Sequence, residues 1–164
     1  MKKHIAIGVI LIIGSGLLMG QGITGSEHDF SSENWNSSGE ICIVCHTPHN
    51  ADNAVSSAPL WNHQVTSATF TLYSSGTLDA TVGQPDGVSK LCLSCHDGTV
   101  AIDNFGGNTN GLQMIGAGEK LGTDISDDHP ISITYDATLA SSDGGLYDPT
   151  QANSGLGGTI DDDM

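Results

Sequence analysis

The hydrophobic positions of this 164-residue chain form one long apolar run, followed by short segments of regular pattern. The run covers residues 5–19 and is interrupted only by Gly and Ser. Beyond it, residues 39–46 and a segment whose N-cap is Ser89 predict two short helices. Residues 69–72 and 131–135 alternate polar and apolar side chains, which predicts two short strands.

Turn-forming residues dominate the rest of the chain. Pro48 disfavours helix in the residue before it, so the first helix should end there. Residues 83–87 contain Pro85 and predict a turn, and the glycine-rich residues 104–124 predict a loop. The expected fold is therefore a small, loop-rich domain with short helices and few short strands.

The N-terminal run has the pattern of an export signal. Lys2 and Lys3 precede it, and Gly20 and Gly22 follow it as the small-x-small pattern of a cleavage site. An uncleaved membrane anchor is the alternative, but fifteen apolar residues are short for a span, which needs about 20. We expect a signal peptide over residues 1–22 and no membrane span after its removal. The mature chain should then be periplasmic or extracellular.

Composition limits both the core and the partners. The mature chain keeps Lys90 and Lys120 as its basic residues against all 19 acidic ones, a formal charge of −17. Nucleic acid and anionic membranes are therefore poor partners, and proteins with basic patches are better ones. Leu, Ile, Val and Phe make up about a fifth of the mature residues, a composition at which high charge usually means disorder. A cofactor that adds apolar mass would explain how such a chain folds.

The cysteines carry the strongest chemical signal. Residues 42–46 read CIVCH and residues 92–96 read CLSCH, and these two segments contain all 4 cysteines. C-x-x-C-H is the attachment signature of c-type haem. Two thiols one helical turn apart reach the two vinyl groups of one porphyrin, and the histidine that follows binds the iron. We therefore predict two haems c per chain, one on Cys42, Cys45 and His46 and one on Cys92, Cys95 and His96.

Three other uses of four cysteines are less consistent with the pattern. A Cys₄ zinc site has no need of a histidine after each pair. A thioredoxin-like C-x-x-C would follow a strand in a βαβ unit, and no such unit flanks either pair. A disulfide within C-x-x-C would close a tight, strained loop.

Histidines are more numerous than proximal ligation requires. Besides the two in the motifs, the mature chain contains four, which are His28, His49, His63 and His129. These are candidates for the sixth iron ligand, with His49 and His129 preferred. Met114 and Met164 are the mature methionines, and neither lies near a motif in the sequence. Bis-histidine ligation is therefore expected.

Four segments together resemble a known family. They are CIVCHTPHN at residues 42–50, PLWNH at 59–63, SKLCLSCHDGTV at 89–100 and DHPIS at 128–132. In this order they resemble exported multihaem c-type cytochromes of metal-reducing and related bacteria, including those that form extracellular filaments. The resemblance covers about residues 28–135.

This resemblance implies closely stacked, bis-histidine, low-spin haems that pass electrons and perform no bond chemistry. In such proteins a histidine shortly after C-x-x-C-H commonly ligates the neighbouring haem, which points to His49. The predicted cleavage site and the composition beyond Leu139 set the expected bounds of a dihaem domain at residues 23–139 and of a Gly/Ser/Asp-rich tail at residues 140–164. Relatives of this kind carry further motifs downstream. Either such motifs follow Met164 in a longer product, or the extra histidines ligate haems of a neighbouring subunit.

Electron transfer, with no enzymatic activity, is thus the leading functional prediction. The expected partners are other redox proteins, copies of this chain or neighbouring multihaem cytochromes. A small haem enzyme of the peroxidase or nitrite-reducing type is the alternative, and it needs one iron with an open coordination position. The surplus of histidines argues against that position. A non-redox surface protein that uses its acidic C-terminal residues is a third reading.

Overall fold

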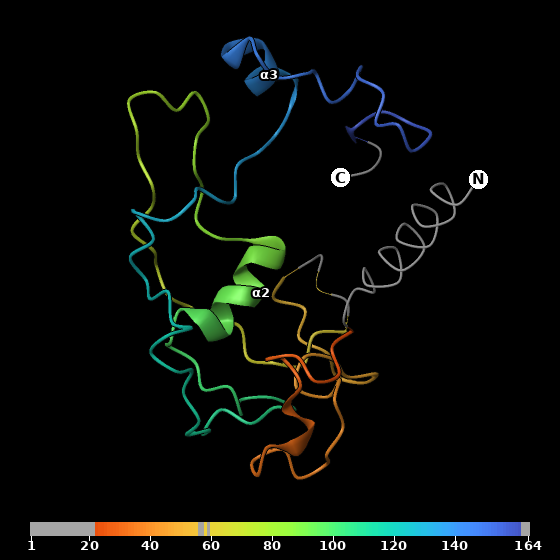
Figure 1. The fold of residues 1–164 in the computed structure, drawn as a ribbon, viewed down its shortest axis with the longest axis vertical. Helices are drawn as coiled ribbons and strands as arrows, with labels where there is room; N and C mark the ends of the chain where they lie inside the picture. The colour runs from red at the N-terminus through yellow and green to blue at the C-terminus, as the bar shows by residue number, and fades with distance from the viewer. Residues whose placement is uncertain (1–21, 56–57, 59, 162–164) are drawn as a thin grey trace, which may run out of the picture. The chain divides into compact units, whose positions relative to one another are not determined.

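Short helices and long irregular connections make up this chain in a computed structural model that describes residues 22–55, 58 and 60–161. Figure 1 shows the helices: a 3-10 helix η1 (Phe30–Ser32), and α-helices α2 (Gly87–His96) and α3 (Ala137–Asp143). The described residues form no strand and pair only in isolated β-bridges. The expectation of a small, loop-rich fold with short helices is confirmed, whereas the two predicted strands are absent.

The chain divides into two compact units, Met1–Ile41 and Cys42–Met164. In the described part of the first unit, the Asp29 side chain caps η1 by accepting from the Ser31 backbone N–H. The rings of Phe30 and Trp35 lie 5.4 Å apart, and Asn36 Nδ2 donates to the Phe30 carbonyl at 3.0 Å. Aromatic contacts and the hydrogen bonds of a buried amide therefore help to hold the described part of this unit together.

The predicted helix over residues 39–46 is wrong. Residues 41–45 form turns, closed by the His46 N–H donating to the Cys42 carbonyl at 2.8 Å. Gly39, where the helix was expected to begin, has a φ of 65°, outside the right-handed helical range. Asn62 donates to the Ile43 and Cys45 carbonyls, through its side chain and its backbone respectively. The Thr47 N–H turns to the Leu60 carbonyl at 2.8 Å, so tertiary pairing replaces the helix.

The second predicted helix is present but begins earlier than expected. The N-cap of α2 is Asp86, not Ser89, and the Asp86 carboxylate accepts from the Gly87 N–H at 2.8 Å. Pro85 precedes this cap, within the predicted turn of residues 83–87, which the structure leaves as an irregular connection into the helix. α2 buries Leu91, Leu93 and Ser94.

The two predicted strands are extended segments that pair with other groups. Residues 69–72 contribute a single bridge, Thr71 with Asp124, and residues 131–135 contribute one, Ile133 with Val82. The Gln84 side chain forms two hydrogen bonds with the backbone of Phe70. It accepts from the Phe70 N–H and donates to the Phe70 carbonyl, both at 2.9 Å. Since this side chain fills the place of a partner strand, no ladder extends from Phe70.

The hydrophobic core is small. Its one cluster contains Phe70, Leu93 and Ile125, with Ala68, Leu72 and Ile131 packed partly buried against it. Several large apolar side chains remain exposed, namely Leu60, Val88, Leu112, Met114, Leu121, Tyr147 and Leu156 among others. This scarcity of buried apolar surface agrees with the composition of the chain.

Helix α3 was not anticipated, and it crosses the boundary predicted after residue 139. Asp136 caps it by accepting from the Leu139 N–H at 2.8 Å, and Gly144 ends it with a φ of 73°. Beyond α3 the chain folds back on itself, since the Ile160 N–H donates to the Ala152 carbonyl at 3.0 Å. Short-range hydrogen bonds therefore order the segment expected to be a tail.

The predicted signal peptide lies outside the described residues, apart from Gly22. Within the residues that are described, no helix is long and apolar enough to cross a bilayer.

Replacing Asn62 by Ala should destabilise the mature protein. The Asn62 side chain donates to the Ile43 carbonyl and accepts from the Gly106 N–H at 3.1 Å. Losing two hydrogen bonds of a half-buried residue should lower the free energy of unfolding by about 1–3 kcal/mol in denaturant titrations. Asn53→Ala, at an exposed loop position, is the matched control. Equal losses in both variants would contradict this assignment.

Candidate functional site

The first C-x-x-C-H motif lies on a turn whose position is fixed by contacts with another segment of the chain. Cys42 and His46 are exposed, and Cys45 is half-buried. His46 pairs with Trp61 in an antiparallel bridge, and their rings meet edge to face with centroids 6.2 Å apart. The position of the motif thus depends on a segment fifteen residues downstream.

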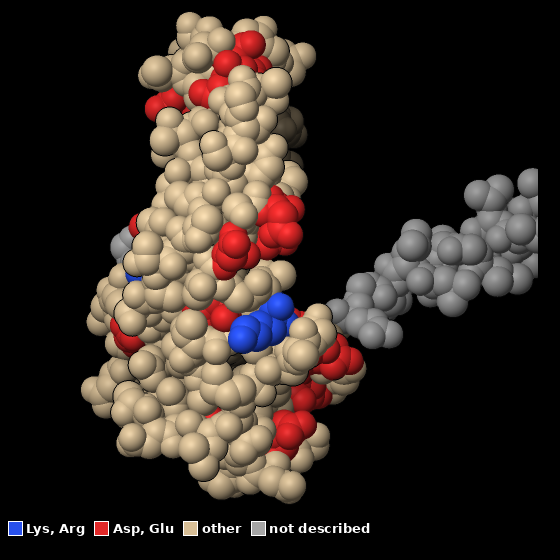
Figure 2. All heavy atoms as spheres, turned by 90° about the vertical axis from the view of Figure 1, so that its left-hand side faces the viewer, with Lys and Arg blue, Asp and Glu red and all other residues tan. Residues whose placement is uncertain are grey.

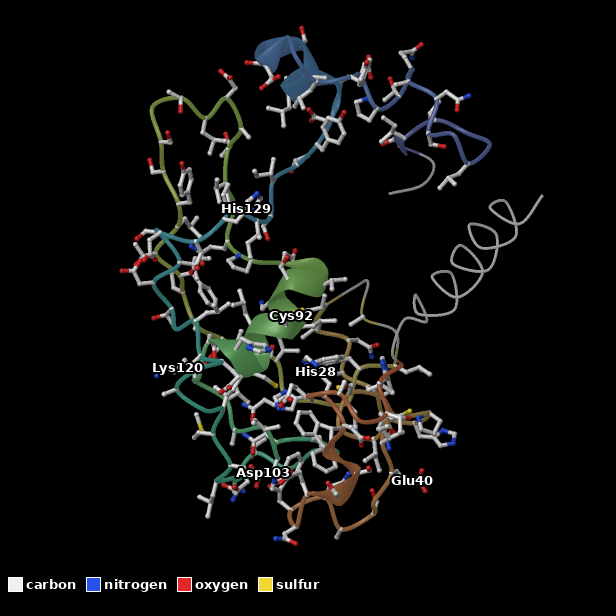
Figure 3. The ribbon with its side chains drawn as sticks, in the orientation of Figure 1. His28, Glu40, Cys92, Asp103, Lys120 and His129 are labelled. Carbon is white, nitrogen blue, oxygen red and sulfur yellow. The ribbon has the colours of Figure 1, made fainter. Side chains whose placement is uncertain are left out.

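The second motif occupies the last turns of α2, and Figure 3 shows Cys92 on this helix. Cys92 and Cys95 lie one helical turn apart. As in the first motif, the first cysteine is exposed and the second is half-buried. Burial is the main cause that raises the pKa of the Cys95 thiol to about 12, and the charges of Cys45, Asp97 and Cys92 add to it.

The two motifs converge although fifty residues separate them. Burial raises the pKa of the Cys45 thiol, and charges on Cys42 and Cys92 raise it further. His63 Nε2 lies 3.6 Å from Cys95 Sγ, and the Trp61 ring contacts both His63 and His46, so the two motifs lie near one another. The structure therefore brings the predicted attachment residues into one region of the second unit.

Residues 60–66 connect the two motifs. The Asn62 N–H donates to the Cys45 carbonyl at 3.0 Å, and the Asn62 carbonyl accepts from the Gly106 N–H at 3.2 Å. Four residues on, the Thr66 N–H donates to Ser94 Oγ at 3.0 Å, which attaches the segment to α2. One short stretch of chain thus contacts the first motif, the helix of the second and the loop that follows it.

A backbone carbonyl orients the second-motif histidine. His96 Nδ1 lies 2.7 Å from the Glu119 carbonyl oxygen, which can only accept, so Nδ1 carries the proton. This tautomer leaves the lone pair on Nε2, the nitrogen suited to an axial iron ligand. The geometry of His96 therefore fits the role predicted for it.

The Glu119 carbonyl that contacts His96 belongs to the predicted loop over residues 104–124. Asp103 organises its start, since its carboxylate accepts from the N–H groups of Leu112 and Gln113 at 3.2 and 2.9 Å. Figure 3 shows Lys120 beside the C-terminal end of α2. A Cβ at Gly98, where φ is 70°, would lie 2.7 Å from Lys120 Cε, so glycine permits this close passage.

Aromatic rings link the two motifs. Trp61 lies between His46 and His63, with its ring centroid 6.4 Å from that of His63. His63 Nε2 in turn lies 3.6 Å from Cys95 Sγ. The indole N–H of Trp61 is buried and has no hydrogen-bond acceptor among the described residues. Leaving such a group unpaired costs about 1–3 kcal/mol, so a bound group with an acceptor atom would stabilise this site.

The four candidates for the distal ligand differ in their surroundings. His28 is exposed in the first unit. His49 is exposed just after the first motif, where the Thr47 hydroxyl donates to its carbonyl at 2.9 Å. His129 is also exposed, and the nearby Ser132 accepts from the Asp86 N–H, which puts this segment near the N-terminal end of α2 (Figure 3).

His63 differs from the other three because it is 1% exposed. Its Nδ1 lies 2.9 Å from the Gln64 carbonyl oxygen and its Nε2 3.0 Å from that of Ala101. Both ring nitrogens thus face backbone carbonyls, an arrangement that suits a bridging residue better than an iron ligand in this conformation. The Trp61 and Asn62 contacts, and a buried Asp97, were not found from the sequence. For Asp97 a signal existed, since Asp97-Gly98-Thr99 is a typical side-chain-capped turn.

The alternatives for the cysteines were a disulfide, a redox-active pair and a zinc site. All four cysteines are free thiols. Over the described residues, no group of three or more His, Cys, Asp or Glu side chains is arranged to hold a bare metal ion. No protein-family model matches the chain, and no curated protein is significantly similar to it. The resemblance to multihaem cytochromes therefore stays a prediction from the motifs.

The free energy of unfolding should fall with acid because of His63. Burial lowers the pKa of His63, and hydrogen bonds with the Ala101 and Gln64 backbones oppose this only in part. Since the pKa in the unfolded chain is about 6.5, stability should be full above that pH and fall as the pH drops toward the folded-state value. His63→Gln should flatten this fall between about pH 7 and about pH 5, and His129→Gln should not. A wild-type slope in His63→Gln would contradict the assignment.

Proposed function

We propose that this chain is an exported electron-transfer protein that carries two covalently attached haems c. The observation that carries the proposal is the convergence of two complete C-x-x-C-H motifs, which residues 60–66 connect through the Asn62 contact with Cys45 and the His63 contact with Cys95. The Nδ1 hydrogen bond of His96 and the orphaned indole N–H of Trp61 support it.

Each motif would hold one haem through its two cysteines and its histidine. Cys42 and Cys45, and likewise Cys92 and Cys95, would form thioethers, and His46 and His96 would bind the irons. When bound, each haem supplies an iron that accepts and returns one electron. The Glu119 carbonyl keeps the imidazole of His96 in its ligating tautomer, and Trp61 packs against the imidazole of His46.

The exposed apolar side chains also support a bound apolar cofactor. Leu60 is 54% exposed directly before Trp61, and Leu121, whose N–H donates to the His96 carbonyl at 2.8 Å, is 53% exposed. Val88 is exposed on α2 itself. Two porphyrins would cover apolar surface of this kind and add to a core that is small on its own.

The distal ligands proposed are histidines. His49 and His129 are the preferred pair because both are exposed. His49 lies three residues after the first motif, and His129 lies near the N-terminal end of α2, the helix that carries the second motif. His28 is a further candidate. His63 is the least suited of the four, since backbone carbonyls face both of its ring nitrogens.

The proposed partners are redox proteins with basic patches, other multihaem cytochromes or further copies of this chain. Acidic side chains are spread over much of the face drawn in Figure 2, and basic ones are sparse there. A formal charge of −17 for the mature chain attracts cationic surfaces over distances of about 10 Å at moderate salt. The periplasm or the cell exterior is the proposed location, from the predicted signal peptide.

Haem stoichiometry tests the proposal directly. The mature protein, made in a host that matures c-type cytochromes, should contain two haems by pyridine haemochrome, and its mass should account for both. Replacing Cys92 and Cys95 by Ala should leave one haem, and the matched change at Cys42 and Cys45 should leave the other. A wild-type protein without covalent haem would refute the function.

The spin state tests the axial ligands. The oxidised protein should show low-spin ferric signals in electron paramagnetic resonance, because two imidazoles give a strong ligand field. His49→Ala and His129→Ala should each convert one haem to the high-spin form. His63→Ala, which also removes an imidazole, should leave both haems low-spin. A dominant high-spin signal in the unmodified protein would contradict bis-histidine ligation.

A further inference from the structure

Asp97 is the one buried carboxylate among the described residues, and it directly follows His96. It is 1% exposed, and neutral groups bind both of its oxygens. The Thr99 N–H donates to Oδ1 at 2.7 Å, and the Thr66 hydroxyl donates to Oδ2. The Thr99 hydroxyl lies 2.9 Å from each oxygen.

These contacts hold a negative charge in place without neutralising it. Hydroxyl and amide donors stabilise a carboxylate anion, and no cation is among the Asp97 partners that the described residues provide. Thr66 is itself fixed, because its N–H donates to Ser94 Oγ and Ser94 is fully buried. Lys120 passes over Gly98, but it is exposed, so water screens its ammonium group.

A charge at such a buried site interacts strongly with nearby charged groups, because little water screens it. The Coulomb energy of two charges rises as the effective dielectric constant falls from the value of water to that of a protein interior. The Asp97 charge already contributes to the raised pKa of the Cys95 thiol. Asp97 directly follows His96, and its N–H donates to the Leu93 carbonyl at 2.8 Å, so the carboxylate is fixed at the end of the helix that carries the second motif.

We infer that the buried carboxylate of Asp97 lowers the reduction potential of the haem held by Cys92, Cys95 and His96. This inference rests on the proposed function. Reduction adds one electron and removes one positive charge from the iron centre. A fixed negative charge nearby stabilises the ferric form more than the ferrous form, so reduction becomes less favourable.

The test compares Asp97→Asn with Asp79→Asn in the intact two-haem protein. Asn keeps the shape of the side chain and removes its charge. Asp79 is exposed on a loop, so its variant removes the same charge from a screened position. In a mediated spectroelectrochemical titration, Asp97→Asn should raise one of the two midpoint potentials by about 59 mV or more, a tenfold change in the one-electron equilibrium. Asp79→Asn should leave both potentials in place.

Haem content and circular dichroism of the same samples separate the outcomes. A wild-type protein without haem refutes the proposed function, whereas two haems with unchanged potentials in Asp97→Asn overturn this inference alone. Asp97→Ser provides a second neutral variant, whose hydroxyl can still accept from the Thr99 N–H. If neither variant yields folded protein with two haems, Asp97 is a structural residue and the inference is overturned.

Discussion

The structure depends on the hydrogen bonds that residues 60–66 form with both C-x-x-C-H segments. Asn62 occupies two carbonyls of the first motif and, through Gly106, the loop after the second. Thr66 extends the same stretch to α2. With so little apolar surface buried, these polar contacts are what bring two distant parts of the chain together, since a net hydrogen bond contributes about 1 kcal/mol and several act in one place.

The two motif sites are built differently. The second stands on a capped helix, and its histidine is oriented by the Glu119 carbonyl and followed by the buried Asp97. The first stands on a turn, and its histidine packs against Trp61. A helix brings its own hydrogen bonds, whereas a turn requires partners from elsewhere, so the first site depends on the rest of the fold more than the second does.

The small core and the exposed apolar side chains have a common cause in the composition. A chain with few aliphatic residues cannot offset its conformational entropy by burial alone. Phe70, Leu93 and Ile125 form one cluster, and side chains such as Leu60 and Leu121 stay in contact with water near the motifs. In the proposed holoprotein, covalent attachment would fix the missing apolar mass at these places.

The sequence by itself determined two C-x-x-C-H motifs, a strongly acidic composition, a loop-rich fold and a helix at the second motif. These follow from local spacing and composition. Tertiary structure alone decided that the first motif is a turn, that residues 69–72 and 131–135 make bridges and not strands, and that His63 and Asp97 are buried. The reason is that a backbone carbonyl or N–H group forms its hydrogen bond with whichever partner the fold brings to it. For Ile43 and Phe70 those partners were the side chains of Asn62 and Gln84, which no local pattern reveals.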